Sequence, residues 1–119
     1  MNAGRDIILV TDNSNSRLST QGGVITLIAT PEGHLFINPT GNAGMATGGT
    51  GDVLTGMIAA WLAQLLDAEA ACRLAVFVHG AAGDLGSGKE GEVAMIATDL
   101  LVHVGEALNQ LTGRPANST

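Results

Sequence analysis

Apolar runs in the first forty residues are short and are separated by polar turns, the pattern of β-strands. The run IILV at residues 7–10 predicts a short buried strand. Residues 13–23, NSNSRLSTQGG, are polar and rich in turn-forming residues, so we expect a loop there. The runs at residues 24–29 and 35–37 lie on either side of the turn PEGH and predict a β-hairpin.

Apolar runs after residue 50 are much longer and predict helices. The segment DVLTGMIAAWLAQLL, which starts at Asp52, is rich in Ala and Leu. Its apolar residues occur nearly all round a helical projection, so we expect a helix that is buried on several sides. A second helix is expected to start at an Asp67 N-cap and to run to about Asp84.

A third helix is expected towards the end of the chain. The segment GSGKEGE at residues 86–92 predicts a loop. Thr98 or Asp99 can cap the helix that follows, which we expect to end at Leu111. Residues 113–119 are expected to form a flexible tail.

The order of strands and helices restricts the fold class. A chain of 119 residues is long enough for one compact domain, and we place that domain at residues 1–112. Strands followed by helices fit an α+β domain, or the C-terminal part of a larger α/β fold. The choice between the two depends on the glycine-rich segment between the hairpin and the first helix.

Composition and charge exclude several classes of protein. Charged residues make up 13% of the chain, against about a quarter in a typical domain, while apolar residues reach 45%. So few charges favour burial against another copy of the chain, and hence a homo-oligomer. The net charge of −6 disfavours nucleic acid as a partner. No apolar run is long enough to span a membrane, and the lone Cys72, read as a small core residue, favours a reducing, cytoplasmic setting.

The segment GMATGGTGD at residues 44–52 carries the candidate chemistry. A Walker loop needs a lysine after its last glycine, and this segment has none. The dinucleotide fingerprint needs a third glycine where Leu54 stands. What remains is a series of backbone amides that lead directly into a helix and can bind phosphate. Their residues are Gly48, Gly49, Thr50 and Gly51.

Asp52 directly follows these amides and requires its own explanation. A carboxylate at a helix N-terminus is stabilised in its charged form, so Asp52 can accept a proton from a substrate hydroxyl. Amides that hold a phosphoryl group beside such a base suit phosphoryl transfer to an alcohol, with Mg²⁺ offsetting the negative charge. The alternative is that Asp52 is an ordinary N-cap or first-turn acid and that the glycines only allow close packing.

The wider sequence around this segment resembles a known family. NPTGNAGMATGGTGDVLTGMIAAWLAQ, followed by AVFVHGAAGDLGS and MIATDLLVHVGEAL, is similar to the ADP- or ATP-dependent NAD(P)H-hydrate dehydratases. These repair enzymes belong to the ribokinase-like superfamily. The similarity extends over about residues 23–111. It implies a truncated ribokinase-like α/β fold, in which short strands and a β-hairpin precede three helices.

The resemblance also implies an activity and a site. Family members restore hydrated NADH or NADPH by phosphorylating the added hydroxyl and eliminating phosphate, with Mg²⁺ and ADP or ATP. The family's catalytic aspartate falls on Asp52, and its adenine-nucleotide glycine falls on Gly51. Residues 49–51 would form the anion hole, and Gly23 and Thr26 match a segment that borders the nucleotide.

The sequence departs from the family pattern in two places. Gly22 stands where the family has a lysine, and the family's long N-terminal portion has no counterpart in the short leading segment. Two alternatives to catalysis therefore stay open, a non-catalytic nucleotide- or phosphate-binding module and a structural oligomeric relic. In all three cases we expect a second copy of the chain to cover the exposed edge of the sheet.

Other polar residues carry weaker expectations. Asn38 and Asn42 flank the glycine-rich loop, and bracing of the loop is favoured over contact with nucleotide, for which Asn42 stays a candidate. His79 and Asp84 are five residues apart, a spacing that does not suit two metal ligands on one helix face, so we expect a satisfied core histidine and no metal site. Trp61 is expected to anchor a helix interface, with adenine stacking as the alternative.

Overall fold

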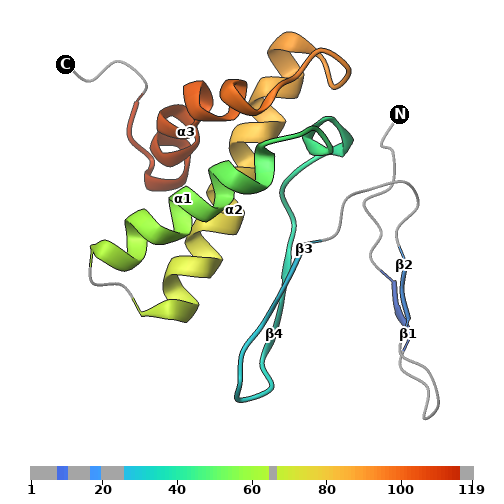
Figure 1. Ribbon diagram of the computed structural model, residues 1–119, viewed down its shortest axis with the longest axis vertical. Coiled ribbons are helices and arrows are strands. Elements are labelled where there is room, and N and C mark those ends of the chain that lie inside the picture. The colour runs from blue at the N-terminus through green and yellow to red at the C-terminus, as the bar shows by residue number, and fades with distance from the viewer. Residues whose placement is uncertain (1–7, 11–16, 20–25, 65–66, 116–119) are drawn as a thin grey trace.

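The computed structural model describes residues 8–10, 17–19, 26–64 and 67–115 (Figure 1). Two short strands, β1 (Ile8–Val10) and β2 (Arg17–Ser19), pair antiparallel, with Leu9 opposite Leu18. The strand expected at residues 7–10 is confirmed over its described part. The prediction of a loop throughout residues 13–23 is wrong at β2, because a strand of three residues is too short to produce a recognisable alternation.

The predicted hairpin is confirmed and leads into the candidate site. Strand β3 (Thr26–Ala29) pairs antiparallel with β4 (Leu35–Asn38), and Thr26 lies opposite Asn38. The turn between them is closed by the Gly33 amide, which donates to the Thr30 carbonyl at 3.0 Å. Glycine suits this turn because its φ is 89°.

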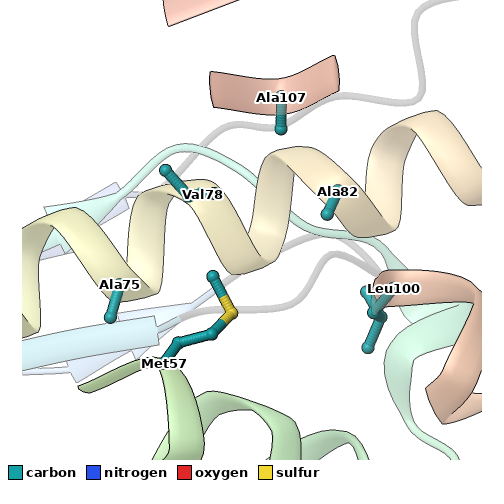
Figure 2. Packing of buried hydrophobic residues seen from close by; sticks show 6 residues of the cluster. All are labelled: Met57, Ala75, Val78, Ala82, Leu100 and Ala107. Atoms are coloured by element: carbon teal, nitrogen blue, oxygen red, sulfur yellow. The ribbon is translucent and has the colours of Figure 1, made fainter. Parts of the chain in front are cut away.

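Three α-helices follow the hairpin and enclose the core. A short 3₁₀ helix, η1 (Ala43–Met45), precedes α1 (Thr50–Ala63), α2 (Ala68–Glu90) and α3 (Ala97–Thr112). Helix α2 lies between the other two and packs against both (Figure 1). The core is built around small side chains of α2, as Figure 2 shows, and its buried members are Met57, Ala75, Val78, Ala82, Leu100 and Ala107. Strands first and helices afterwards confirm the predicted order.

The end of α2 and the start of α3 differ from the prediction. Asp67 caps α2 as expected, since its carboxylate accepts from the Ala70 amide at 2.8 Å. The helix then continues to Glu90 through the predicted loop, and Gly86 is buried within it beside the side chain of Met95. The N-cap of α3 is Ile96, so neither Thr98 nor Asp99 is the cap.

Helix α1 is more exposed than its sequence predicts. Met57 is its only buried residue, and Leu62 is 43% exposed, so the expected burial on several sides is wrong within the described part of the chain. One face of α1 packs on α2, and Trp61 is half-buried against the core, as expected of an interface anchor. Cys72 is half-buried, so it is not a fully enclosed core residue. None of the described helices is both long and apolar enough to cross a membrane.

Candidate functional site

The loop between β4 and α1 is fastened to α2 at its base. The side-chain amide of Asn38 is buried and donates to the carbonyls of Thr40, at 2.9 Å, and Val76, at 3.4 Å. The Thr40 hydroxyl lies 2.9 Å from the Phe77 carbonyl and 3.0 Å from Asn38 Oδ1. The bracing expected of Asn38 is therefore observed.

A second set of contacts holds the loop one residue further on. Asp84 of α2 accepts from the Gly41 amide at 3.1 Å and from Asn42 Nδ2 at 3.0 Å. The carbonyl oxygen of the Asn42 side chain accepts from the Gly44 amide at 3.0 Å, which caps η1. Both ends of the Asn42 side chain are thus engaged by the protein itself.

Gly49 is the turn that starts α1. It is the N-cap residue, with a left-handed φ of 94°, and its carbonyl accepts from the Val53 amide at 3.1 Å. A side chain here would be strained by this φ and would press on Ala97. Because glycine has no side chain, it cannot cap the first amides of the helix.

The two neighbouring glycines, Gly48 and Gly51, are not required by the packing of the chain. Neither has a positive φ, and a Cβ atom built at either position meets none of the residues that the structure describes within 4 Å. The space beside these two residues is open, so another molecule can approach their backbone closely.

Asp52 is the third residue of α1 and is exposed to solvent. No hydrogen bond or ion pair joins its carboxylate to the residues that the structure describes. Gly49 is the N-cap, so Asp52 is a first-turn acid whose carboxylate is available to a ligand.

Thr50 connects this turn to the rest of the protein. Its hydroxyl lies 2.9 Å from the Met45 carbonyl and 3.0 Å from the Thr47 carbonyl, so it holds the loop against the first turn of α1. Its own carbonyl is 2.8 Å from His79 Nε2 of α2. Because a carbonyl can only accept, Nε2 carries the proton in this contact.

His79 is half-buried and hydrogen-bonded, which confirms the expected satisfied histidine. Burial lowers the pKa of its imidazole below 6.5, partly opposed by the hydrogen bond with Thr50. The neutral ring is therefore the favoured form beside the glycine turn. Sequence reasoning missed this link between α2 and the first residue of α1, and it also missed the loop contacts of Asp84.

Of the remaining predicted site residues, Thr26 lies at the base of the loop. Thr26 starts β3, and it shares a cavity of about 180 Å³ with His79, Gly41 and Met45. Gly23 and Gly22 lie outside the described residues. The described residues contain no group of three or more His, Cys, Asp or Glu side chains that could hold a metal ion.

The family model for NAD(P)H-hydrate dehydratase matches residues 19–105, which include the whole glycine turn and the segment of α2 that supports it. The chain belongs to this family.

Curated members of the NAD(P)H-hydrate dehydratase family are closely similar over part of their length. The bifunctional NAD(P)H-hydrate repair enzyme Nnr of Moorella thermoacetica is 53% identical over 79 residues, 66% of this chain and 15% of the relative. The ADP-dependent (S)-NAD(P)H-hydrate dehydratase of Bacillus subtilis is 43% identical over 75 residues, 63% of this chain and 27% of the relative. The chain thus corresponds to well under a third of the length of either protein.

Solved structures of NAD(P)H-hydrate dehydratases share the fold. The ADP/ATP-dependent enzyme of Bacillus subtilis, crystallised with ATP and Mg²⁺, matches with a TM-score of 0.67 at 37% identity, over 71% of this chain and 30% of that structure. The Bacillus subtilis protein YxkO matches with a TM-score of 0.69 at 33% identity, over 87% of this chain and 35% of that structure. These similarities confirm the predicted family and fold class.

Proposed function

We propose that this chain forms the phosphate-binding and catalytic loop of an ADP- or ATP-dependent NAD(P)H-hydrate dehydratase. One observation carries the proposal. At the start of α1, uncapped amides, two glycines that leave open space beside them, and the unengaged carboxylate of Asp52 lie on one turn of backbone.

The residues present fit a nucleotide phosphate. The first amides of α1 have no intrahelical acceptor, and the helix dipole favours negative charge at this end. Side chains at Gly48 and Gly51 would occupy the space through which a phosphate group approaches these amides. Among the described residues Asp52 is the acid on this turn, so Mg²⁺ would be held chiefly by the phosphate groups.

Asp52 provides the acid–base chemistry in this proposal. The nucleotide, with its Mg²⁺, supplies the phosphoryl group. The hydroxyl of the hydrated nicotinamide ring would lose its proton to the Asp52 carboxylate as its oxygen takes the terminal phosphoryl group, whose bond to the rest of the nucleotide breaks. Departure of that group from the ring as phosphate would then restore the reduced nicotinamide. The amides at residues 49–51 hold the phosphoryl oxygens in place.

Calorimetric titration with ADP and with ATP, both in the presence of Mg²⁺, tests the binding part of this proposal. Gly51→Val fills the open space beside the turn and is expected to abolish binding without disturbing the fold. Gly56→Val is the matched control, since Gly56 lies on the same helix and its Cβ would also meet nothing within 4 Å.

The result that supports the proposal is binding that Gly51→Val removes and Gly56→Val preserves. Binding unaffected by Gly51→Val would place the nucleotide elsewhere. No binding at millimolar nucleotide would leave the turn as a packing element and favour a structural role for the chain. Binding without turnover of hydrated NADH would favour a nucleotide-binding module.

We also propose that the chain assembles with further copies of itself. Several large apolar side chains are exposed, among them Val93, Leu101 and Val102, the last at 76%. An apolar groove also lies between the β3–β4 hairpin and the first half of α2. Sedimentation velocity tests this proposal, and a monomer throughout the working concentration range would contradict it.

A further inference from the structure

The face of α2 beneath the glycine-rich loop is built to bring the loop onto the helix. A Cβ atom at Gly80 would collide with Thr40, and one at Gly83 would collide with the Met45 side chain. The spacing of three residues places both glycines on the same side of α2. The loop therefore lies directly on the helix at Gly80, where the Thr40 backbone leaves no space for a side chain, and a side chain at Gly83 would displace that of Met45.

Asp84 directly follows Gly83, and its carboxylate makes polar contacts with the same loop. Its two carboxylate oxygens accept from the Gly41 amide and from Asn42 Nδ2, at 3.1 and 3.0 Å. Asn42 in turn accepts from the Gly44 amide. Among the described residues, three donors thus meet three acceptors in this group, and we name Gly41, Asn42, Gly44 and Asp84 the clamp.

The clamp is linked to the candidate site through a short path of backbone. Gly44 belongs to η1, and the Met45 carbonyl at the end of η1 accepts from the Thr50 hydroxyl at 2.9 Å. Thr50 is the first residue of α1, next to Gly51 and Asp52. A shift of η1 on α2 would therefore move the amides that are proposed to hold phosphate.

We propose that Asp84 is a positioning residue for nucleotide binding and that it acts through the clamp. The inference rests on the proposed function for its effect on affinity, but the clamp itself can be measured in the free protein. Asp84 does not contact the phosphate. It fixes η1, which sets where Thr50 and the following amides lie.

Hydrogen-bond complementarity predicts how substitutions at the clamp behave. With Asp84→Asn the clamp contains four donors and only two acceptors. Whichever way the new side-chain amide at position 84 is turned, one N–H group then faces another. Asn42→Asp places two carboxylates against each other. The double substitution Asn42→Asp with Asp84→Asn exchanges the amide and the carboxylate, and again matches three donors to three acceptors.

The experiment measures affinity for Mg²⁺-ADP and amide hydrogen exchange in the wild-type chain and its variants. Asp84→Asn is expected to weaken binding about tenfold and to speed exchange of the Gly41 and Gly44 amides about tenfold. The double substitution Asn42→Asp with Asp84→Asn is expected to bring both the affinity and the amide exchange rates back to within about threefold of wild type. Glu69→Gln, which removes an exposed carboxylate from the same helix, is expected to change neither.

Two outcomes would overturn the inference. One is wild-type affinity and exchange in Asp84→Asn. The other is a double variant that is as impaired as Asp84→Asn, because a general loss of stability would not be reversed by restoring complementarity. If Asp84→Asn does not fold, Asn42→Ala replaces it, with a smaller change expected in the same direction.

The two proposals can fail separately. If wild type does not bind nucleotide, the proposed function fails, and the clamp is judged by hydrogen exchange alone. Faster exchange in Asp84→Asn, reversed in the double variant, then supports a clamp that positions the loop. Unchanged exchange overturns it.

Discussion

Helices α1 and α3 both carry an aspartate as their third residue, yet the two helix starts are built differently. At α3 the Asp99 carboxylate accepts from the amide of the N-cap residue Ile96 at 2.8 Å. At α1 the Asp52 carboxylate makes no such bond, and the N-cap is Gly49. The same residue type at the same position is therefore engaged in one helix and unengaged in the other.

The backbone of the N-cap residue explains this difference. Ile96 is extended, with φ −119° and ψ 167°, which allows its amide to face the first turn of α3. Gly49 is left-handed, with φ 94° and ψ −13°, and neither N-cap residue has a side chain that caps the first amides of its helix. The Asp99 carboxylate at the start of α3 is engaged by the backbone of the chain itself, whereas the Asp52 carboxylate at the start of α1 is left for another molecule.

The largest expected effect is on turnover, which we expect to depend on Asp52 and not on Asp99. We expect Asp52→Asn to lower turnover of hydrated NADH by about 10²–10⁴-fold, because it removes the proposed general base. Asp99→Asn is the matched control and is expected to leave the turnover close to wild type. A steady-state assay with Mg²⁺ and ADP measures both. Equal turnover in the two variants would refute a catalytic role for Asp52.

The next effect compares two glycines on either side of Thr50 in the turn. Gly49→Ala is expected to reduce the free energy of unfolding by about 1–2 kcal/mol, because alanine is strained at a left-handed φ. Gly51→Ala enters open space in a helix and is expected to be neutral, or stabilising by up to about 1 kcal/mol. Urea denaturation followed by circular dichroism distinguishes the two. A similar loss in both variants would mean that Gly51 is also needed for folding.

A smaller effect tests which aspartate stabilises its helix. Asp99→Ala removes a hydrogen bond to the N-cap amide, so we expect a loss of about 1 kcal/mol in unfolding free energy. Asp52→Ala removes only a favourable interaction with the helix dipole, about 0.5 kcal/mol or less. Thermal denaturation provides the measurement. The comparison breaks down if Asp52→Ala proves the more destabilising substitution.

The smallest expected effect concerns the support of α1 by His79. Burial lowers the pKa of this imidazole below 6.5, so the folded state binds its proton less readily than the unfolded chain does. Its contribution to stability is therefore fully present above pH 6.5 and declines as the pH falls from 6.5 towards the lower pKa of the folded state. Denaturation of wild type and His79→Gln at several pH values measures this contribution, and parallel pH profiles would contradict it.

The elements of the fold with long or regular patterns could be predicted from the sequence. The hairpin and the Asp67 cap could be predicted because turns and helix caps depend on the residue types at a few neighbouring positions. The end of α2 was missed because Gly86 and Gly88 suggest a loop, whereas the helix runs on to Glu90 with Gly86 buried against neighbouring residues. Tertiary packing outweighed local preference there.

Only the part of the candidate site that lies in one continuous segment could be predicted from the sequence. The sequence of the glycine turn identified the amides and Asp52, since those features lie in one continuous segment. The contacts of Asp84 with Gly41 and Asn42 join residues more than 40 positions apart, which no local pattern indicates. The available signal was the pair Gly80 and Gly83 directly before an acid, which indicates a helix face closely approached by another segment.

The most direct test of the contrast between the two helix starts is a ¹H–¹⁵N correlation spectrum recorded during titration with Mg²⁺-ADP. We predict saturable shifts of the Thr50, Gly51 and Asp52 amides that are much larger than any shift of the Ile96 and Asp99 amides at the α3 start; the Ala97 amide is not compared, because Ala97 lies beside Gly49. Unchanged α1 amides at saturating nucleotide, or equal shifts at both helices, would contradict the account.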